Sequence, residues 1–315
     1  MPAKLLDGNE IAATIKAEIV AEVRAMAAAD LQPGLAVVMA GNDPASEIYL
    51  AGKVRACQEA GIFSEKHYLP ANVSTRAMVE LVEELNRSED IDGILVNLPL
   101  PPQVDYKTVQ MAVDPAKDVD GFHPVNIGFL STHRPGLVPC TPAGIIQILE
   151  RSQIPMDGAE AVVVGRSDIV GKPTAMLLLN HNATVTVCHS HTRHLPEVCR
   201  RADILIAAVG EPGIITRQHV KPGATVIDVG VNRLTDRALV EKFFTPNSPK
   251  AAAFAKRGAV VMGDVHPEVS EIAGALTPVP GGVGPLTVVM LMVNTLRAAR
   301  ARHAVAQSAS AEASK

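Results

Sequence analysis

The sequence predicts an α/β protein with two domains, each built around a parallel β-sheet. Its 315 residues are enough for about two domains of ordinary size. Short apolar runs alternate with amphipathic segments, which is typical of parallel strands covered by helices. The alternation is broken by a turn-rich stretch at about 99–140 and then resumes. One domain is therefore expected on each side of this stretch.

The first series of elements opens with an amphipathic helix. Its apolar stripe is formed by Ile11, Ile15, Ile19 and Val23. Asp43 is a suitable N-cap for a second helix, with Pro44 at the first helical position. The further elements expected are a strand at 35–40, the second helix from 44 to about 60, a strand at 62–69, a helix at 74–87 and a strand at 93–98. Met78, Val82 and Leu85 should face inward from the 74–87 helix.

The second series begins where Thr141-Pro142 opens a helix that ends near residue 150. Apolar runs predict strands at 161–164, 183–188, 203–209 and 224–229. The region 234–258 is polar and irregular, with weak helical character, and a short strand follows at 260–261. The last helix should run from Pro285 to about residue 302, followed by a flexible tail at 303–315.

Composition excludes several classes of function. The net charge of −4 gives no support to nucleic-acid binding, which needs a basic surface. The longest apolar run, at about 286–293, is too short for a membrane helix. The N-terminal segment carries charges that do not fit a signal peptide. None of the four cysteines forms a C-x-x-C pair, which is typical of a protein of the reducing cytoplasm.

The strand at 161–164 runs into a glycine-bounded loop, Gly165 to Pro173, and then into a helix. A strand, such a loop and a helix N-terminus together form the phosphate site of dinucleotide-binding sheets. The spacing lacks the middle glycine of G-x-G-x-x-G, so a plain strand-to-helix connection is the alternative.

Residues near this loop favour NADP over NAD. Arg166 directly follows the first glycine, and the next strand ends in Cys188-His189-Ser190. NAD-preferring sites usually place an acid there for the ribose hydroxyl, and this chain has none. Arg166 and Ser190 would instead suit a 2′-phosphate.

Ser46, Tyr49 and Lys53 share one face of the helix at 44–60, because they are three and four residues apart. The alternative is an ordinary solvated helix face. Short-chain dehydrogenases use a similar Tyr/Lys pair, but there the dinucleotide loop comes first. Here the pair would belong to a separate domain and meet the nucleotide across an interdomain cleft.

Three other segments attract attention. The acids of 114–123 could form a solvated or calcium-like loop, although their spacing does not match an EF-hand. The Gly/Pro-rich loop 277–285 could bring bare backbone against a planar ligand or be only a tight connector. The segment 188–194 has metal-binding residue types, but it matches no zinc spacing, so no metal is expected.

Together these segments closely resemble the bifunctional methylenetetrahydrofolate dehydrogenase/methenyltetrahydrofolate cyclohydrolase family. The matching segments are SEIYLAGK (46–53), GILVNLPLPP (93–102), KDVDGFHP (117–124), PCTPAG (139–144), VVGRSDIVGKP (163–173), ATVTVCHSHT (183–192), VIDVGVN (226–232) and TPVPGGVGPLT (277–287). They occur in the family's order and cover most of residues 1–300.

The resemblance implies two α/β domains across a cleft. Residues 1–140 would be the folate-binding catalytic domain, completed by the C-terminal helix at 278–302. Residues 141–277 would form a Rossmann-like, doubly wound parallel sheet that binds NADP. The resemblance also implies a tetrahydrofolate substrate and a homodimer.

The resemblance also assigns roles to individual residues. Lys53 matches the family's catalytic lysine, Tyr49 the tyrosine that stacks on the folate, and Asp120 the acid that holds the pterin. Pro278, Gly281 and Gly282 match the folate-lining loop, to which Ser46 is added as a substrate contact. The cofactor contacts expected are Thr141, Gly165, Arg166, Ser167, Ile169, Ser190, Gly230 and Val231.

One position departs from the family. Asn97 stands where the family usually has Gln, which is thought to hydrogen-bond the catalytic lysine. The Asn side chain is one methylene shorter than Gln and would reach the lysine less directly. An enzyme with only the dehydrogenase or only the cyclohydrolase activity is therefore an alternative. Two other readings remain: a dehydrogenase for another small substrate and a non-catalytic NADP-binding sensor. The region 234–258 is also longer than the family's usual loop.

Overall fold

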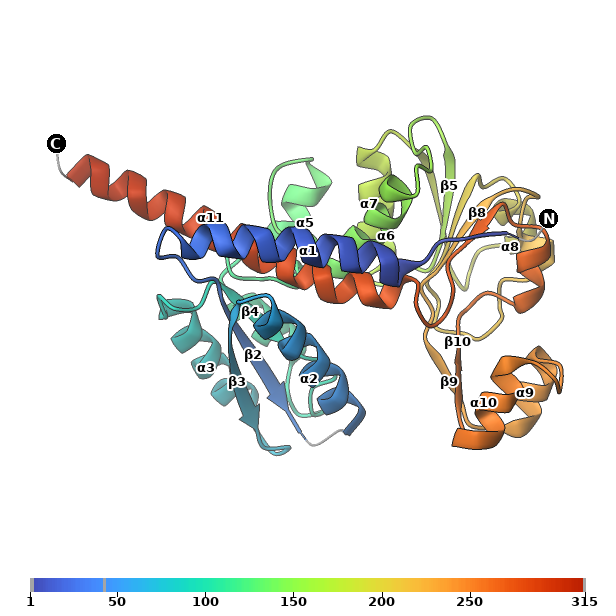
Figure 1. Cartoon of the computed structure of the whole chain (residues 1–315), viewed down its shortest axis with the longest axis horizontal. Coiled ribbons are helices and arrows are strands. Elements are labelled where there is room, and N and C mark those ends of the chain that lie inside the picture. The colour runs from blue at the N-terminus through green and yellow to red at the C-terminus, as the bar shows by residue number, and fades with distance from the viewer. Residues whose placement is uncertain (1–2, 42–43, 314–315) are drawn as a thin grey trace. The chain divides into compact units, whose positions relative to one another are not determined.

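The computed structural model describes residues 3–41 and 44–313 (Figure 1). The chain divides into two compact units. One contains residues 13–140 and 288–315 and is called here the three-stranded unit, and the other contains residues 1–12 and 141–287 and is called the six-stranded unit. The predicted α/β class is confirmed. The division lies at residue 140, and residues 1–12 and 278–287 group with the second sheet.

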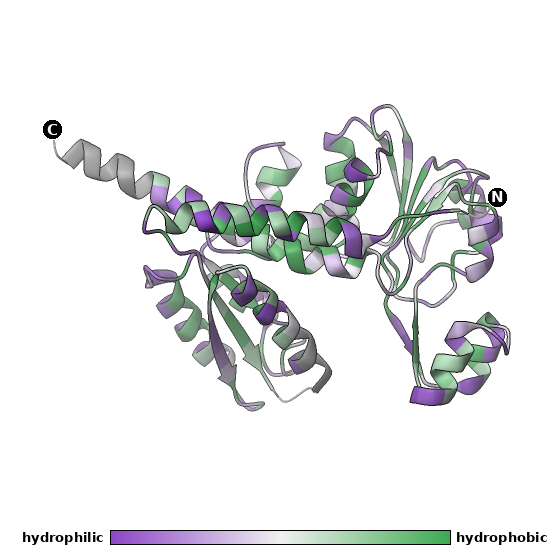
Figure 2. Ribbon diagram, in the orientation of Figure 1, coloured by the Kyte–Doolittle hydropathy of each residue, from purple (hydrophilic) through white to green (hydrophobic). Residues whose placement is uncertain are grey.

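The sheet of the three-stranded unit has the order β3-β2-β4, and all its strands are parallel. The central strand β2 (Gly34–Ala40) is buried along its whole length, between β3 (Phe63–Leu69) and β4 (Gly93–Val96). Figure 2 shows the resulting contrast between the hydrophobic β2 and the more polar edge strand β3. These strands match the predicted ones closely.

Helices α1 (Gly8–Ala27), α2 (Pro44–Glu59) and α3 (Thr75–Arg87) also occur where they were predicted. Three residues of the α1 stripe are buried, namely Ile15, Ile19 and Val23. The predicted inward residues of α3 are buried as well, namely Met78, Val82 and Leu85. Ser74 caps α3 by accepting a hydrogen bond from the Ala77 amide. Asp43, the predicted cap of α2, lies outside the described residues.

The stretch predicted as a long loop at 99–140 contains two short helices, α4 (Tyr106–Ala112) and α5 (Pro124–Ser131). Side chains of Asp105 and His123 cap them, and Pro124 occupies the first turn of α5. The caps compensate for the shortness of these helices, because helices of one or two turns satisfy few of their own backbone groups.

The main sheet of the six-stranded unit is all-parallel, with the order β1-β11-β8-β7-β5-β6. Three of its inner strands are β5 (Glu160–Val164), β7 (Ile204–Ala207) and β8 (Thr225–Asp228), and β6 (Thr184–Cys188) forms one edge. The chain goes from β5 outward to β6 and then returns to the other side of β5 with β7. Ligands of doubly wound sheets bind at such a switch point, beyond the carboxyl ends of the strands.

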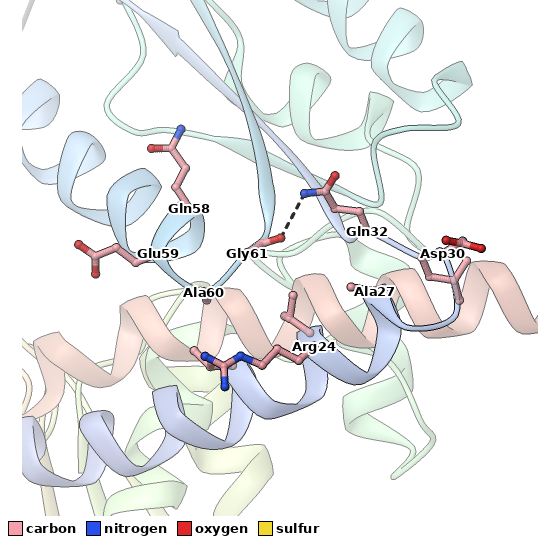
Figure 3. Close-up of a pocket in the computed structure, with 11 residues that line it drawn as sticks. Arg24, Ala27, Asp30, Gln32, Gln58, Glu59, Ala60 and Gly61 are labelled. Carbon is pink, nitrogen blue, oxygen red and sulfur yellow. Dashed lines mark hydrogen bonds between the residues drawn. The ribbon is translucent and has the colours of Figure 1, made fainter.

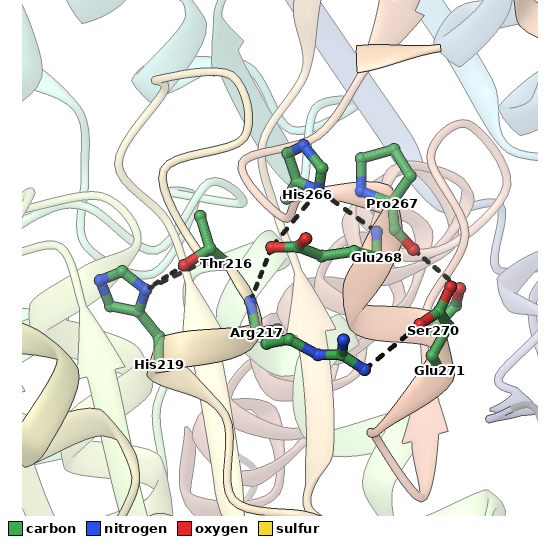
Figure 4. Close-up of polar contacts among 8 residues, drawn as sticks. All are labelled: Thr216, Arg217, His219, His266, Pro267, Glu268, Ser270 and Glu271. Atoms are coloured by element: carbon green, nitrogen blue, oxygen red, sulfur yellow. Dashed lines mark hydrogen bonds and ion pairs between the residues drawn. The ribbon is translucent and has the colours of Figure 1, made fainter. Parts of the chain in front are cut away.

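Helices α6 (Cys140–Arg151), α7 (Gly171–Asn180) and α8 (Leu195–Cys199) connect or flank these strands. Two-residue strands, β1 (Lys4–Leu5) and β11 (Ala275–Leu276), extend the sheet on the β8 side. Two 3₁₀ turns, η1 (Arg217–His219) and η2 (Pro267–Glu271), are joined by polar contacts shown in Figure 4. Among them, the Arg217 guanidinium lies 3.2 Å from the Glu271 carboxylate.

The region 234–258, predicted to be irregular, is more ordered than expected. It contains α9 (Arg237–Phe243) and α10 (Pro249–Arg257), which lie between the antiparallel strands β9 (Asn232–Leu234) and β10 (Val260–Met262). The final helix, α11 (Val283–Ala313), also extends further than predicted. None of the helices in the described ranges is both long and apolar enough to span a bilayer.

Candidate active site

Lys53 lies on α2 of the three-stranded unit and is only 8% exposed. A buried ammonium group requires a compensating polar environment. Its charge acts on Asp120 and on the Cys140 thiol, because it lowers the pKa of both groups against the larger opposing effect of burial. Ser46 and Tyr49 occupy the same helix, but their side chains lie outside the described residues.

Asp120 has a strongly perturbed carboxyl group. Burial raises its pKa to about 7, Lys53 opposes this shift, and Asp118 adds to it. Asp120 lines a small hollow together with Tyr106, Gln110 and other residues of β4 and α4. Burial also raises the pKa of Tyr106, and the charges of Asp120 and Asp118 add to that effect. The structure thus brings Lys53 and Asp120 into one electrostatic environment and adds Tyr106, which was not among the residues predicted from sequence.

The neighbours of Asp120 in the acidic segment have structural tasks. Lys117 donates to the carbonyls of Leu85, Asn86 and Ser88, at 3.1, 2.8 and 2.7 Å, and so closes the end of α3. Asp118 accepts hydrogen bonds from the His123 amide at 2.7 Å and from the Asn126 side chain at 2.9 Å. Lys117 and Asp118 are thus bonded to other groups of the protein. This favours a structural role for the segment over a calcium-like loop.

Asn97 directly follows β4 and is 6% exposed. Its backbone amide donates to the Val38 carbonyl at 2.8 Å, which fixes it beside the central strand. Its side-chain amide donates to the Leu98 carbonyl at 3.4 Å. The contact with Lys53 that the family resemblance implies therefore stays a prediction.

In the six-stranded unit, the predicted phosphate loop follows β5 at the switch point. Gly165 has φ +129°, and a Cβ there would lie 2.1 Å from the Ala208 carbonyl oxygen, so only glycine fits. Gly171 begins α7, and a Cβ there would lie 2.3 Å from the Gly165 carbonyl oxygen. The Ser167 hydroxyl accepts bonds from the amides of Val170 and Gly171, both at 3.2 Å. The loop is therefore tightly wound against the start of α7.

Arg166 and Ser190 are both exposed and leave adjacent parallel strands at the same edge of the sheet. The Gly165 amide donates to the Cys188 carbonyl at 2.9 Å, which holds the two strand ends together. Ile169, in the phosphate loop, is 37% exposed. An exposed guanidinium and hydroxyl at this edge can reach a bound anion, as the sequence predicted for a 2′-phosphate.

The loops after β7 and β8 are joined by Asp264, which is completely buried. One of its oxygens accepts from the amides of Val209 and Gly210, at 2.6 and 2.9 Å, and the other accepts from the Asn232 side chain at 2.9 Å. A Cβ at Gly230 would lie 2.2 Å from this carboxylate, which explains the glycine. Val231, a predicted cofactor contact, is 72% exposed beside it.

A second buried carboxyl, Asp228, ends β8. It accepts backbone bonds from Gly230, Asp264 and Val265, at 3.1, 2.8 and 3.1 Å. Burial raises its pKa to about 7, partly offset by these bonds. Neither Asp228 nor Asp264 was predicted as a site residue, although an acid within an apolar run was a usable signal in both cases.

The remaining predicted residues also lie in the six-stranded unit. The Thr141 hydroxyl is 3.0 Å from that of Thr287. Gly281 has φ +101°, and its carbonyl accepts from the Gly8 amide at 2.8 Å. A Cβ at Gly282 would lie 2.5 Å from the Pro278 carbonyl oxygen. The loop that carries Pro278, Gly281 and Gly282 is therefore rigid and closely packed against the start of α1.

Two larger cavities of the three-stranded unit have other linings. One, of about 640 Å³, is lined by α1, the loop after it and the end of α2 (Figure 3), where the Gln32 side chain donates to the Gly61 carbonyl at 3.4 Å. The other, of about 730 Å³, lies among α5, α11 and nearby loops. Neither lining includes a predicted site residue among the described residues. In the same residues, no group of three or more His, Cys, Asp or Glu is arranged to hold a metal.

Two sequence models of one family match this chain. The "Tetrahydrofolate dehydrogenase/cyclohydrolase, catalytic domain" matches residues 6–120, and the NAD(P)-binding domain of the same family matches residues 139–303. The chain belongs to the tetrahydrofolate dehydrogenase/cyclohydrolase family. Both of the family's domains are therefore present in one chain.

Relatives of known name and structure agree with this membership. A "Bifunctional protein FolD" from Koribacter versatilis (strain Ellin345) is 64% identical over 302 residues, which cover 96% of this chain and 98% of the relative. A structure of the bifunctional FolD enzyme from Campylobacter jejuni has a TM-score of 0.87 at 38% identity and covers 95% of this chain and 99% of its own. A Trypanosoma brucei FolD, complexed with NADP cofactor and inhibitor, has a TM-score of 0.85 at 36% identity, with coverage of 96% and 99%.

Proposed function

We propose that this tetrahydrofolate dehydrogenase/cyclohydrolase family member is bifunctional. It oxidises 5,10-methylenetetrahydrofolate to 5,10-methenyltetrahydrofolate with NADP, and it hydrolyses the methenyl product to 10-formyltetrahydrofolate. The observation that carries the proposal is the buried Lys53, whose charge acts on Asp120, in a chain that matches both domains of the family.

The six-stranded unit fits a dinucleotide cofactor. Gly165 and Gly171 leave bare backbone at the start of α7, where a Cβ would meet neighbouring backbone atoms. Arg166 and Ser190 would hold the 2′-phosphate of NADP, and the loops at Gly230 and Val231 would contact the rest of the cofactor. When bound, the nicotinamide supplies the hydride acceptor for the dehydrogenase reaction.

In the three-stranded unit, Lys53 would perform the proton transfers of the hydrolysis. Water adds to the methenyl carbon, and a base must take a proton from it while the ring nitrogen that leaves this carbon gains one. A single amine that passes between its charged and neutral forms can do both. Asp120 would hold the pterin ring in place, as the family resemblance implies, and Tyr49 would stack on it. Alignment of the substrate is what the direct hydride transfer requires most.

We further propose that the protein is a homodimer that works in the cytoplasm. The family resemblance supports the dimer. The cytoplasmic location is supported by the four cysteines, which are all buried and unpaired with one another as disulfides.

The test is an assay of the purified protein with methylenetetrahydrofolate, with NADP and NAD offered separately. The same preparation then receives methenyltetrahydrofolate alone, and its disappearance is followed. We expect reduction of NADP together with accelerated loss of the methenyl compound. Reduction without hydrolysis would contradict the bifunctional proposal and identify Asn97 as the residue to change back to Gln. Absence of both activities would contradict the proposal entirely.

A further inference from the structure

Asn294 is a fully buried amide in the apolar part of α11, within the three-stranded unit. Its side-chain nitrogen donates to the carbonyl oxygens of Val119 and Val138, both at 2.8 Å. These two carbonyls belong to segments on either side of α5. The amide therefore ties the C-terminal helix to the residue immediately before Asp120.

The segment around Asp120 has little freedom once Val119 is held. The Cys140 thiol donates to the same Val119 carbonyl at 3.3 Å. On the other side of Asp120, a Cβ at Gly121 would lie 2.5 Å from backbone atoms of Val138 and Pro139. Residues 119–121 are thus pressed against 138–140, and Asn294 bridges the two segments at their point of contact.

Only part of the Asn294 amide is satisfied by hydrogen bonds. Its oxygen, Asn294 Oδ1, is buried and has no hydrogen-bond partner among the described residues. An unpartnered buried acceptor costs about 1–3 kcal/mol. An apolar side chain would fill this space without that cost. We therefore infer that the position needs the two hydrogen bonds that Asn294 donates.

We propose that Asn294 is a positioning residue for the folate site, which acts by fixing the backbone on which Asp120 is presented. The inference rests on the proposed function, in which Asp120 holds the pterin ring. It adds a role for the C-terminal helix: the helix sets the direction of an acid more than a hundred and seventy residues earlier in the chain.

The experiment compares Asn294→Leu with Asp120→Asn and with the double variant. We expect Asn294→Leu to raise KM for methylenetetrahydrofolate about threefold to tenfold, with KM for NADP unchanged, because only the pterin contact is displaced. In the Asp120→Asn background, the same change should add nothing to the folate KM, because the two residues act through one contact. Asn294→Ser, which keeps a shorter donor, should have a smaller effect and provides a second variant if the leucine form folds poorly.

Thr295→Val is the matched control, since Thr295 is equally buried on α11 but donates within its own helix, to the Leu291 carbonyl at 2.9 Å. It should leave both KM values unchanged. A loss of folded protein would lower the apparent kcat and leave KM unchanged, so it cannot account for a raised KM for methylenetetrahydrofolate. Additive effects of the two substitutions, or an equal rise in both KM values, would overturn the inference. If Asp120→Asn itself leaves the folate KM unchanged, the assigned role of Asp120 is what fails.

Discussion

Each unit of this enzyme holds a carboxyl group whose pKa is raised to about 7 by burial, and the two carboxyls have different surroundings. Asp228 in the six-stranded unit is surrounded by backbone donors, from Gly230, Asp264 and Val265. Asp120 in the three-stranded unit lies in the field of Lys53 and lines a hollow with Tyr106. The same pKa shift thus belongs to a structural carboxyl in one unit and to the carboxyl proposed to hold the substrate in the other.

The two units also differ in the exposure of their predicted functional side chains. The three-stranded unit buries Lys53, and removal from water suits a group proposed to transfer protons. The six-stranded unit exposes its predicted contacts, Arg166 and Ser190, and shapes its loops with glycines and buried acids. Binding a charged cofactor needs accessible donors and rigid backbone more than altered acidity.

The largest expected effect is that of Lys53→Met. It should lower the cyclohydrolase rate by at least about a hundredfold, because the group that moves the proton is lost. The dehydrogenase activity should be spared to a greater extent, since hydride transfer needs alignment rather than acid–base help. Rates of both reactions with saturating substrates provide the measurement. Lys66→Met, which removes an exposed lysine on β3, is the control, and a cyclohydrolase rate equal to that of the control would contradict the role of Lys53.

Arg166→Ala should reduce the preference for NADP over NAD by about tenfold to a hundredfold, the size of a lost charge-assisted hydrogen bond. The ratio of kcat/KM for the two cofactors measures it. Arg201→Ala is the matched control, because Arg201 pairs with Glu160 at the opposite end of β5, at 3.3 Å. If the ratio of kcat/KM for NADP and NAD is unchanged in Arg166→Ala, Arg166 does not contact the 2′-phosphate.

The titration of Asp120 should appear in substrate binding. Its pKa of about 7 means that the carboxylate form grows as pH rises from 6 to 8. If the ionised form holds the pterin, KM for methylenetetrahydrofolate should fall by about tenfold over this range. Asp120→Asn, which cannot ionise, should have a flat profile. A wild-type profile that stays flat, or one that persists in the variant, would assign the dependence elsewhere.

The titration of Asp228 should appear in stability, with a smaller effect. Because its folded-state pKa is raised from 3.8 to about 7, the folded state binds the proton more strongly than the unfolded chain does. This contribution is lost as pH rises from about 4 to about 7. Between pH 6 and 8, the free energy of unfolding should lose about 1 kcal/mol. Chemical denaturation at several pH values gives the free energy of unfolding as a function of pH. This dependence should be weaker in Asp228→Asn than in the wild type, and an equal dependence would contradict the raised pKa of Asp228.

Most of the sheet framework could be predicted from sequence, because buried parallel strands such as β2 and β5 are continuous apolar runs. The short helices α4 and α5 were missed, although Asp105 and Pro124 are ordinary start signals. The two-residue strands β1 and β11 depend on pairing between distant segments, so no local pattern could reveal them.

The site was predicted unevenly. Glycines required by close contacts, such as Gly165 and Gly230, lie within the segments that match the family. Residues that support the site from a distance do not, because their role depends on tertiary contacts. Asp264 joins two loops, and Asn294 reaches back to Val119, and neither contact has a signature in sequence spacing.

We propose that proton transfer belongs to the three-stranded unit and cofactor selection to the six-stranded unit. The most direct test of this division is to measure both methenyltetrahydrofolate hydrolysis and the NADP dissociation constant in Lys53→Met, beside Arg166→Ala. We expect Lys53→Met to lose hydrolysis and to bind NADP as the wild type does, whereas Arg166→Ala should bind NADP about tenfold or more weakly. Lys53→Met that hydrolyses methenyltetrahydrofolate at the wild-type rate, or that loses NADP affinity as Arg166→Ala does, would contradict the division.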